Sequence, residues 1–403
     1  MTMYQTIKTI PVSGKRVVVR VDYNVPFDKK TGGISDDSRI KLTLPSLEYL
    51  IDQNAKIILI SHRGRPSGKS ESFSLKPIGE RLSSLLGINV PVLDDCIGDE
   101  IIAKTLSLPP GGIVLLENLR FYEEEEANDQ AFSYALSLLG DYYVNEAFSV
   151  SHRAHASIES LPQLMPSVAG FLMEKEIFEL GRILRTPSKP LSLIMGGAKV
   201  SDKMNLMEKL VPLSENILVG GGMAAAFLRA SGHNIGTSML EPNGEVLARK
   251  IVSVAKTNKT NLLIPEDVLI SDSISNSGFF QTVKVDSISS NQMIVDIGPK
   301  TTSNFSKILE TSQTILWNGP MGIFEVDEFS NGTKEIAQAI EEQANNGGIT
   351  LLGGGSTAEA AKKFGILDKV THVSTGGGAS LQFLEGKDMP GIKHLLTDSS
   401  ENK

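Results

Sequence analysis

The sequence predicts an α/β protein with two doubly wound parallel-sheet (Rossmann-like) domains joined by a connecting helix. Short apolar runs alternate with helical periodicity along nearly the whole chain, which is typical of βαβ units and parallel sheets. The length of 403 residues also favours two domains, because a domain usually holds ~100–200 residues.

The composition excludes several classes of protein. With 40% hydrophobic and 21% charged residues, the chain can form ample core. Its net charge of −8 argues against a general nucleic-acid binder. The single cysteine, Cys96, suits a reducing cytoplasm. We find no signal-peptide pattern after Met1 and no run of ~18 apolar residues, so we expect a cytoplasmic protein without a membrane partner.

The predicted strands fall into two sets. In the first half they are Arg16–Val21, Lys56–Ile60, Ile113–Leu116 and Tyr142–Val144. In the second half they are Leu191–Met195, Asn216–Val219, Leu262–Ile264, Thr314–Trp317, Ile349–Leu352 and His372–Ser374. Helical patterns separate them, at Leu42–Asp52, Pro77–Leu86, Ala131–Leu139, Met223–Ser231, Gly244–Lys256, Lys334–Ala344 and Ala358–Phe364.

A helical stripe marks the boundary between the two sets. Its apolar positions are Met173, Ile177, Leu180 and Leu184, and Thr186-Pro187 ends it. We therefore expect an N-terminal domain over residues 1–168, a connecting helix over 169–185 and a C-terminal domain over 186–385.

Polar and basic side chains follow the strands of the first half. They include Asp22, Tyr23, Asn24, Arg39, His62, Arg63, Gly64, Arg65, Arg120 and Arg153. Open parallel sheets bind ligands at the carboxyl ends of their strands, and arginine matches carboxylate and phosphate oxygens with a planar fork. Any one of these arginines could be an ordinary surface residue, but together they predict a small, highly anionic substrate.

Glycines follow the strands of the second half. The turns are Gly196-Gly197, Gly220–Gly222, Gly319 with Gly322, Gly353–Gly355 and Gly376–Gly378. Most lead directly into a helical pattern, and backbone N–H groups at helix N-termini bind phosphate readily. One such turn is weak evidence because turns need glycine anyway, but the whole set predicts a nucleotide-phosphate site.

The first of these turns also carries two lysines. Lys199 and Lys203 lie four residues apart, so we expect them to share one face of the first turn of a helix. Two positive charges at a helix N-terminus repel each other and oppose the macrodipole, and an anion between them would remove both penalties. The alternative is a solvated turn with two ordinary lysines.

Several other patterns carry no function. The stretch Gly64–Ser70 resembles a Walker A loop but has one residue too few between its glycines. No G-x-G-x-x-G follows the first strand, which argues against a dinucleotide-binding dehydrogenase. The histidines show no zinc spacing. His152 and His155 could line the basic edge of the first domain or simply lie in a loop, and we favour the loop. The acidic run Glu123–Glu126 is interpreted as a solvated face.

Taken in order, the motifs resemble phosphoglycerate kinase over the chain from about Tyr4 to about Gly391. They are Arg20–Pro26, Ser61–Pro66, Leu115–Tyr122, His152–Ser157, Gly196–Lys203, Trp317–Glu325 and Ser374–Leu381. The resemblance implies a phosphoglycerate-binding N-terminal domain, a nucleotide-binding C-terminal domain and a last segment, 386–403, that returns to the first domain. It implies reversible transfer between 1,3-bisphosphoglycerate and ADP, giving 3-phosphoglycerate and ATP with Mg²⁺, by a monomer.

The resemblance also implies roles for the residues that match its motifs. The phosphoglycerate site would consist of Asp22, Tyr23, Asn24, Arg39, His62, Arg63, Gly64, Arg65, Arg120 and Arg153. The nucleotide site would consist of Gly197, Lys203, Gly221, Asn318, Glu325, Gly353, Gly354, Gly355, Ser356 and Thr357. Arg39 and Lys199 would face the transferring phosphoryl group and are the expected catalytic residues.

The sequence departs from the family pattern at Ser356, where an aspartate usually binds the magnesium of the nucleotide. A neutral hydroxyl is a poorer ligand for Mg²⁺ than a carboxylate, although Ser356–Glu359 reads as a capping box. Either the phosphates and water hold the metal, which we favour, or the chain is a metal-impaired, non-catalytic nucleotide-binding homologue. Lesser departures are Arg63, for a common leucine, and the run Glu146–Ser151, which usually reads Asp-Ala-Phe-Gly.

Overall fold

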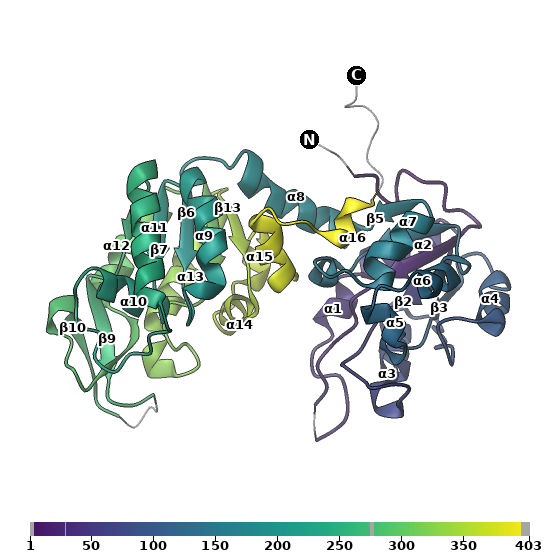
Figure 1. The fold of residues 1–403 in the computed structure, drawn as a ribbon, viewed down its shortest axis with the longest axis horizontal. Coiled ribbons are helices and arrows are strands. Elements are labelled where there is room, and N and C mark those ends of the chain that lie inside the picture. The colour runs from purple at the N-terminus through teal and green to yellow at the C-terminus, as the bar shows by residue number, and fades with distance from the viewer. Residues whose placement is uncertain (1–3, 29, 275–277, 396–403) are drawn as a thin grey trace. The chain divides into compact units, whose positions relative to one another are not determined.

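A computed structural model describes residues 4–28, 30–274 and 278–395 of the chain. The chain divides into two compact units, each of them α/β (Figure 1). Unit 1 comprises Met1–Phe178 and the segment from Asp388 onward, and unit 2 comprises Glu179–Lys387. The division lies inside α8 (Phe171–Arg185), the helix that passes from one unit into the other.

A parallel sheet forms the centre of unit 1. Within the described residues its strands run in the order β3-β2-β1-β4-β5. Their bounds are β1 (Arg16–Arg20), β2 (Lys56–Ile60), β3 (Ile113–Leu115), β4 (Tyr142–Asn145) and β5 (Ser167–Ala169). The order reverses between β1 and β4, and ligands bind to open sheets at such a switch point.

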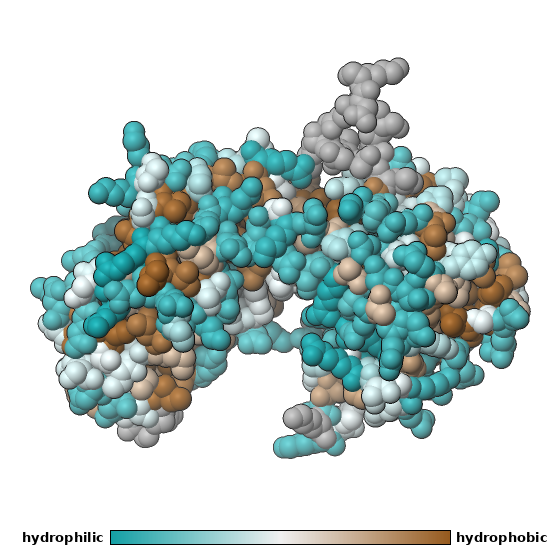
Figure 2. All heavy atoms as spheres, in the orientation of Figure 1, coloured by the Kyte–Doolittle hydropathy of each residue, from teal (hydrophilic) through white to brown (hydrophobic). Residues whose placement is uncertain are grey.

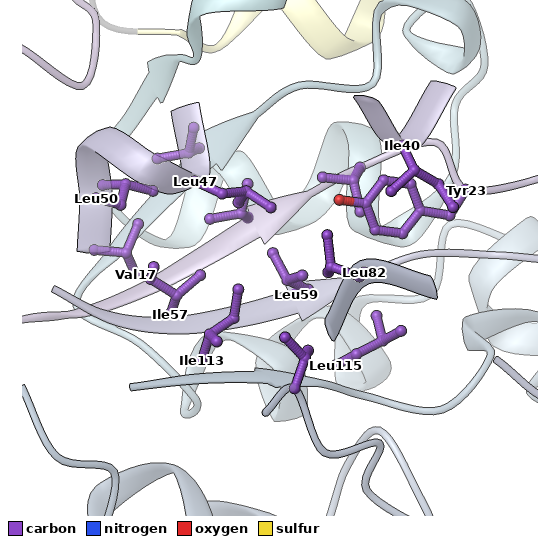
Figure 3. Close-up of a cluster of buried hydrophobic side chains, with 14 of the residues drawn as sticks. Val17, Tyr23, Ile40, Leu47, Leu50, Ile57, Leu59, Leu82, Ile113 and Leu115 are labelled. Atoms are coloured by element: carbon purple, nitrogen blue, oxygen red, sulfur yellow. The ribbon is translucent and has the colours of Figure 1, made fainter. Parts of the chain in front are cut away.

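Helices cover both faces of this sheet. They are α1 (Ser38–Lys41), α2 (Leu44–Asp52), α3 (Lys76–Leu86), α4 (Asp99–Leu106), α5 (Glu123–Glu126), α6 (Gln130–Ser137) and α7 (Leu161–Leu164). Successive strand residues point to opposite faces. Val17 therefore packs with Leu47 and Leu82 of α2 and α3 (Figure 3), while Val18 packs in a second cluster with Leu136 of α6.

Unit 2 contains a longer parallel sheet, in the order β14-β13-β12-β6-β7-β8 among the described residues. Its strands are β6 (Leu191–Met195), β7 (Asn216–Val219), β8 (Asn261–Leu263), β12 (Thr314–Asn318), β13 (Ile349–Leu352) and β14 (His372–Val373). Here the order reverses between β6 and β12. The strands are paired in register from Thr314 with Leu191 to Asn318 with Met195, so the two glycine turns that follow them start side by side.

The helices of unit 2 alternate with these strands. They are α9 (Met204–Leu210), α10 (Met223–Ala230), α11 (Gly244–Asn258), α12 (Pro299–Leu309), α13 (Asn331–Asn345), α14 (Gly355–Lys363) and α15 (Gly378–Leu384). Trp317 of β12 is fully buried in the main cluster, with Ile336 and Ile340 of α13. The alternating pattern and the parallel sheets confirm the predicted fold class.

The sequence prediction omitted an antiparallel sheet in unit 2. It consists of β9 (Asp267–Ser271), β10 (Phe280–Lys284) and β11 (Met293–Ile297), in the order β10-β9-β11. Four of the five residues of β10 are exposed, so this edge strand lacks the alternation of apolar and polar residues that marks a half-buried strand. The three-residue strand β5 was also missed, because it is too short to show a period.

Two helix starts differ from the prediction. A 3₁₀ turn over Ser201–Lys203 precedes α9, which begins at Met204, so the prediction that Lys199 and Lys203 share its first turn was wrong. Helix α14 begins at Gly355 with Gly354 as its N-cap at a φ of 95°. Ser356 therefore lies inside the first turn, and the predicted capping box is not formed.

The last described residues pack on unit 1. Helix α16 (Pro390–Lys393) is held by the N–H of Gly391, which donates to the Ser151 oxygen at 2.9 Å, and by Asn145 Nδ2, which donates to the Gly391 oxygen at 2.8 Å. None of the described helices combines the length and apolar character needed to cross a membrane. Hydrophilic residues cover much of the face shown in Figure 2.

Candidate active site

The switch point of unit 1 holds an ion pair between Asp22 and Arg39. Asp22 follows β1, and its Oδ2 accepts a hydrogen bond from an Arg39 Nη at 2.6 Å. The same Arg39 nitrogen also donates to the Asn24 oxygen at 3.2 Å. The Asp22 side chain is only 8% exposed, whereas that of Arg39 is 41% exposed. The aspartate thus anchors a guanidinium that remains open to solvent and to an anion.

A second group joins the ends of β1, β2 and β3. Asn24 Oδ1 accepts the N–H of Gly64 at 2.9 Å, and Arg120 donates to the Gly64 oxygen at 2.7 Å. Arg120 also pairs with Glu126 at 2.8 Å. Among the described residues, its buried Nε has no hydrogen-bond partner. The structure therefore brings Asn24, Gly64 and Arg120 together, as the sequence predicted.

A buried charge network lies beneath these residues. Arg20 of β1 is 1% exposed, donates to Ser157 Oγ at 2.8 Å and lies 3.9 Å from Glu125 Oε1. Glu125 is fully buried and accepts from the N–H and hydroxyl of Ser157, at 2.9 and 2.6 Å. The interpretation of Glu123–Glu126 as a solvated face was therefore wrong for Glu125. The sequence analysis did not single out Arg20, because its position inside an apolar strand carries no separate signal.

The histidines of this region are neutral at pH 7. Burial is the main cause that lowers the pKa of His62 well below its usual value, and the nearby Arg20 and Arg120 lower it further. Its Nδ1 lies 3.2 Å from an Arg20 Nη. The pKa of His155 falls to about 4 for the same reasons. His62 therefore serves as a hydrogen-bonding group rather than as a cation.

The remaining predicted residues of unit 1 differ in exposure. Tyr23 is fully buried in the core, and its hydroxyl lies 2.8 Å from Thr43 Oγ1. Its side chain is therefore not part of the exposed surface, a correction to the predicted set. Arg63 is half-buried, with its guanidinium 3.6 Å from the Phe27 ring centroid and a hydrogen bond of 2.7 Å to the Ser74 oxygen. Arg65 is exposed and Arg153 is half-buried.

The switch point of unit 2 holds Lys203. Its Nζ donates to the Asn318 oxygen at 2.6 Å and to the Gly196 oxygen. The side chain is 9% exposed, and burial lowers the pKa of the ammonium to about 7. Lys199 is exposed. The two lysines are thus distinct in environment, which the sequence spacing alone did not indicate.

A cavity of about 440 Å³ opens beside these turns. Its lining includes four predicted residues, Gly197, Gly221, Glu325 and Ser356. Gly221 has a φ of 60°, and a Cβ there would lie 2.6 Å from the Pro320 oxygen. Only glycine fits this position without strain, so the backbone of the turn lies directly against the cavity.

Apolar residues that the prediction missed form much of the cavity wall. They are Ala225, Met239, Ile274, Met293, Ile294, Val295 and Ile323. Three of them belong to β11, so the antiparallel sheet supplies one wall. Asp296 also lines the cavity and accepts from the N–H of Gly332 at 2.6 Å, and burial raises its pKa to about 7. A wall of this kind suits a flat, apolar group such as a nucleobase.

The glycine turn Gly353–Gly355, which follows β13, approaches Asn318. Thr357 Oγ1 accepts the N–H of Gly319 at 2.7 Å, and a Cβ on Gly353 would lie 3.3 Å from Asn318 Nδ2. Gly354 and Gly355 lead into α14, so Asn318, Gly353–Gly355 and Thr357 are brought together around the end of β12.

The same turn decides whether the chain itself can hold a metal ion. Ser356 offers a hydroxyl where a carboxylate is expected, and no described residues form a group of three or more His, Cys, Asp or Glu side chains placed to hold a metal. Because Mg²⁺ prefers carboxylate, phosphate and water oxygens, this donor set does not fit a protein-held magnesium ion.

Comparison with known proteins agrees with the resemblance. The family model described as phosphoglycerate kinase matches residues 7–387. The chain belongs to the phosphoglycerate kinase family. Phosphoglycerate kinase from Pelotomaculum thermopropionicum is 45% identical over 97% of this chain and 99% of its own length. Phosphoglycerate kinase from Dictyoglomus turgidum is 47% identical over 95% of this chain and 96% of its own length.

A solved structure of a family member agrees in fold. Phosphoglycerate kinase from Coxiella burnetii matches with a TM-score of 0.90 and 36% identity, covering 97% of this chain and 98% of that one. The family predicted from the motifs is therefore confirmed, and with it the assignment of the chain to a family of kinases.

Proposed function

We propose that the chain catalyses reversible phosphoryl transfer between 1,3-bisphosphoglycerate and ADP, giving 3-phosphoglycerate and ATP. One observation carries this proposal. Each unit has a switch point built for anions, with arginines in unit 1 and with glycine turns and lysines in unit 2. The two sets suit a small phosphorylated acid and a nucleotide, respectively.

In unit 1, we propose that the phosphoglycerate binds to Arg39, Arg120 and Arg153, with Asp22, Asn24, His62 and Gly64 beside them. The half-exposed guanidinium of Arg39 and the unpartnered Nε of Arg120 among the described residues support this assignment. Arg63 and Arg65 add positive charge around the site. Tyr23 contributes by packing under it rather than by contact.

In unit 2, we propose that the nucleotide occupies the cavity of about 440 Å³. The apolar wall takes the base, Glu325 binds the ribose hydroxyls, and the glycine turns bind the phosphates with Lys203, Asn318 and Thr357. Magnesium would enter with the nucleotide, as MgATP or MgADP, and would be held by phosphate and water oxygens. Ser356 adds at most a weak contact.

The chemistry needs no general base. In the direction that consumes ATP, the carboxylate of 3-phosphoglycerate is already ionised at pH 7. It attacks the γ-phosphorus while the bond to the β-phosphate oxygen breaks. Arg39 and Lys199 neutralise the equatorial oxygens of the transferring group, and domain closure brings acceptor and donor in line. We expect a cytoplasmic monomer.

A coupled assay with 3-phosphoglycerate and MgATP across a magnesium titration tests this function. We expect turnover that depends on both substrates, and a control without 3-phosphoglycerate should show no ATP consumption. The residue at position 356 favours one competing function, a nucleotide-binding homologue without catalysis. No turnover at any magnesium level, with nucleotide binding retained, would establish that alternative.

A further inference from the structure

We propose that Ser149 is a positioning residue for the phosphorylated acid, because its hydroxyl holds the Asp22 carboxylate that anchors Arg39. The proposal rests on the proposed function of the unit 1 site. It assigns to Ser149 a role that neither the motifs nor the family resemblance gives it.

Ser149 reaches the site from the opposite side of the switch point. It follows β4 in a 3₁₀ turn over Phe148–Val150, and its Oγ donates a hydrogen bond to Asp22 Oδ2. Asp22 follows β1, the neighbouring strand in the sheet. The contact therefore joins the two loops between which a ligand of this sheet would bind.

The Asp22 carboxylate is held on both oxygens. Oδ2 accepts from Ser149 and, at 2.6 Å, from Arg39. Oδ1 accepts the N–H of Asn24 at 3.2 Å and lies 3.9 Å from His62 Nδ1. Burial of the carboxylate leaves little water to replace a lost donor. Removal of the Ser149 hydroxyl therefore leaves Oδ2 with its bond to Arg39 alone among the described hydrogen bonds, and the carboxylate can rotate to bring Oδ1 toward the guanidinium. The carboxylate can then bind the guanidinium with both oxygens.

That change would compete directly with an anionic substrate. Among the described residues, Arg39 makes its hydrogen bonds through one Nη, to Asp22 and Asn24. Its other N–H groups therefore remain for the substrate. A carboxylate that accepts from two N–H groups of the guanidinium takes one of these groups away from the substrate. The substrate then binds more weakly, while the nucleotide site in unit 2 is unaffected.

The backbone conformation at Ser149 allows the residue to be substituted in order to test this role. Family members usually have glycine at this position, and Ser149 is not among the described residues with a positive φ. Substitution by alanine, glycine or threonine therefore strains no turn. Ser137 offers a matched control, because the described hydrogen bond of its hydroxyl goes to the Tyr134 oxygen within its own helix, α6.

Steady-state kinetics of the full chain gives the decisive measurement. We expect S149A and S149G to raise the KM for 3-phosphoglycerate roughly three- to tenfold, the usual effect of one lost hydrogen bond. The KM for MgATP should not change. S149T retains the hydroxyl and should restore the wild-type KM, and S137A should match the wild type.

The outcomes separate this inference from the proposed function. A wild-type chain without turnover refutes the function. An active wild type whose KM for 3-phosphoglycerate is unchanged in S149A and S149G refutes the role of Ser149. S149T that behaves like S149A, or an equal rise in both KM values, refutes it as well, because the hydroxyl would then not act through Asp22.

Discussion

Nζ of Lys203 donates a hydrogen bond to the backbone oxygen of Asn318 over 2.6 Å, across the switch point of unit 2. The ammonium is nearly buried and its described hydrogen-bond partners are carbonyl oxygens, which carry only partial negative charge. Burial therefore dominates and lowers its pKa to about 7. A polyphosphate bound beside it would supply the missing negative charge and raise that pKa.

Nucleotide binding should therefore be accompanied by proton uptake at Lys203. Near pH 8 the free lysine, with a pKa of about 7, is mostly neutral, whereas in the complex it should be charged. We expect uptake of up to about one proton per ATP at pH 8 and much less at pH 6. Calorimetric titration in two buffers of different ionisation enthalpy measures this number.

The variant K203M is the control for proton uptake. It keeps an unbranched side chain of similar length but cannot take up a proton. We expect weaker binding and the loss of most of the uptake. Binding enthalpies of the wild type that are equal in both buffers at pH 8 would contradict the assignment.

Lys199 should affect catalysis rather than nucleotide binding. This exposed lysine follows the same glycine turn, and we propose that it faces the transferring phosphoryl group. We expect K199A to lower kcat by ~10²–10³, as removal of one transition-state contact does, with little change in the KM for MgATP. The control is K209A, at an exposed lysine of α9. If K199A raised the KM for MgATP and left kcat unchanged, Lys199 would contribute to ground-state binding and not to catalysis.

The sequence predicted the parts of this fold that depend on repeated apolar patterns. Buried strands such as Lys56–Ile60 and Leu191–Met195 were found to the residue, since a continuous apolar run with turns at both ends has few other interpretations. The antiparallel sheet was missed, because β10 is almost fully exposed and its pairing with β9 depends on backbone hydrogen bonds. One wall of the cavity was missed with it.

The sequence also predicted which residues gather at each switch point, but not their environments. Asp22, Arg39, Asn24 and Gly64 lie together as expected, because they follow neighbouring parallel strands. Burial is a property of the packed structure, so the neutral state of His62 and the core position of Tyr23 could not be predicted from spacing. The same holds for Glu125, whose partner Ser157 lies 32 residues away.

The hydroxyl of Ser356 should set the magnesium requirement. This residue lines the cavity at the first turn of α14. We expect S356D to lower the magnesium concentration needed for half-maximal turnover, because a carboxylate is a better ligand than a hydroxyl. The KM for 3-phosphoglycerate should stay the same. S253D adds the same charge at an exposed position of α11 and should leave the requirement unchanged.

An unchanged magnesium dependence in S356D would show that residue 356 does not approach the metal of the nucleotide. Turnover measured at one total ATP concentration, with total magnesium as the only variable, gives the half-maximal magnesium concentration separately from the maximal rate, and so distinguishes this outcome from a general gain or loss of activity.

Glu146 accepts hydrogen bonds from the first turn of α8. Its contribution to the stability of the fold should depend on pH. The residue follows β4 and accepts from the N–H groups of Leu172 and Met173, at 2.9 and 3.1 Å, and from the Ser46 hydroxyl. Although these bonds favour the carboxylate, burial outweighs them and raises its pKa from 4.5 to about 7. The side chain thus caps the helix that passes into unit 2 at the cost of a buried charge.

The sign of the pH effect follows from this raised pKa. Between about pH 4.5 and 7 the folded chain binds more protons at Glu146 than the unfolded chain, so the free energy of unfolding falls as pH rises through this range. E146Q can still accept the two N–H bonds but does not titrate. We expect it to gain stability over the wild type as pH rises from 5 to 8, by roughly 2.5 kcal/mol. Urea unfolding at both pH values measures this, with E48Q at an exposed position of α2 as control. Parallel pH profiles of E146Q and the wild type would show that Glu146 is not the group responsible.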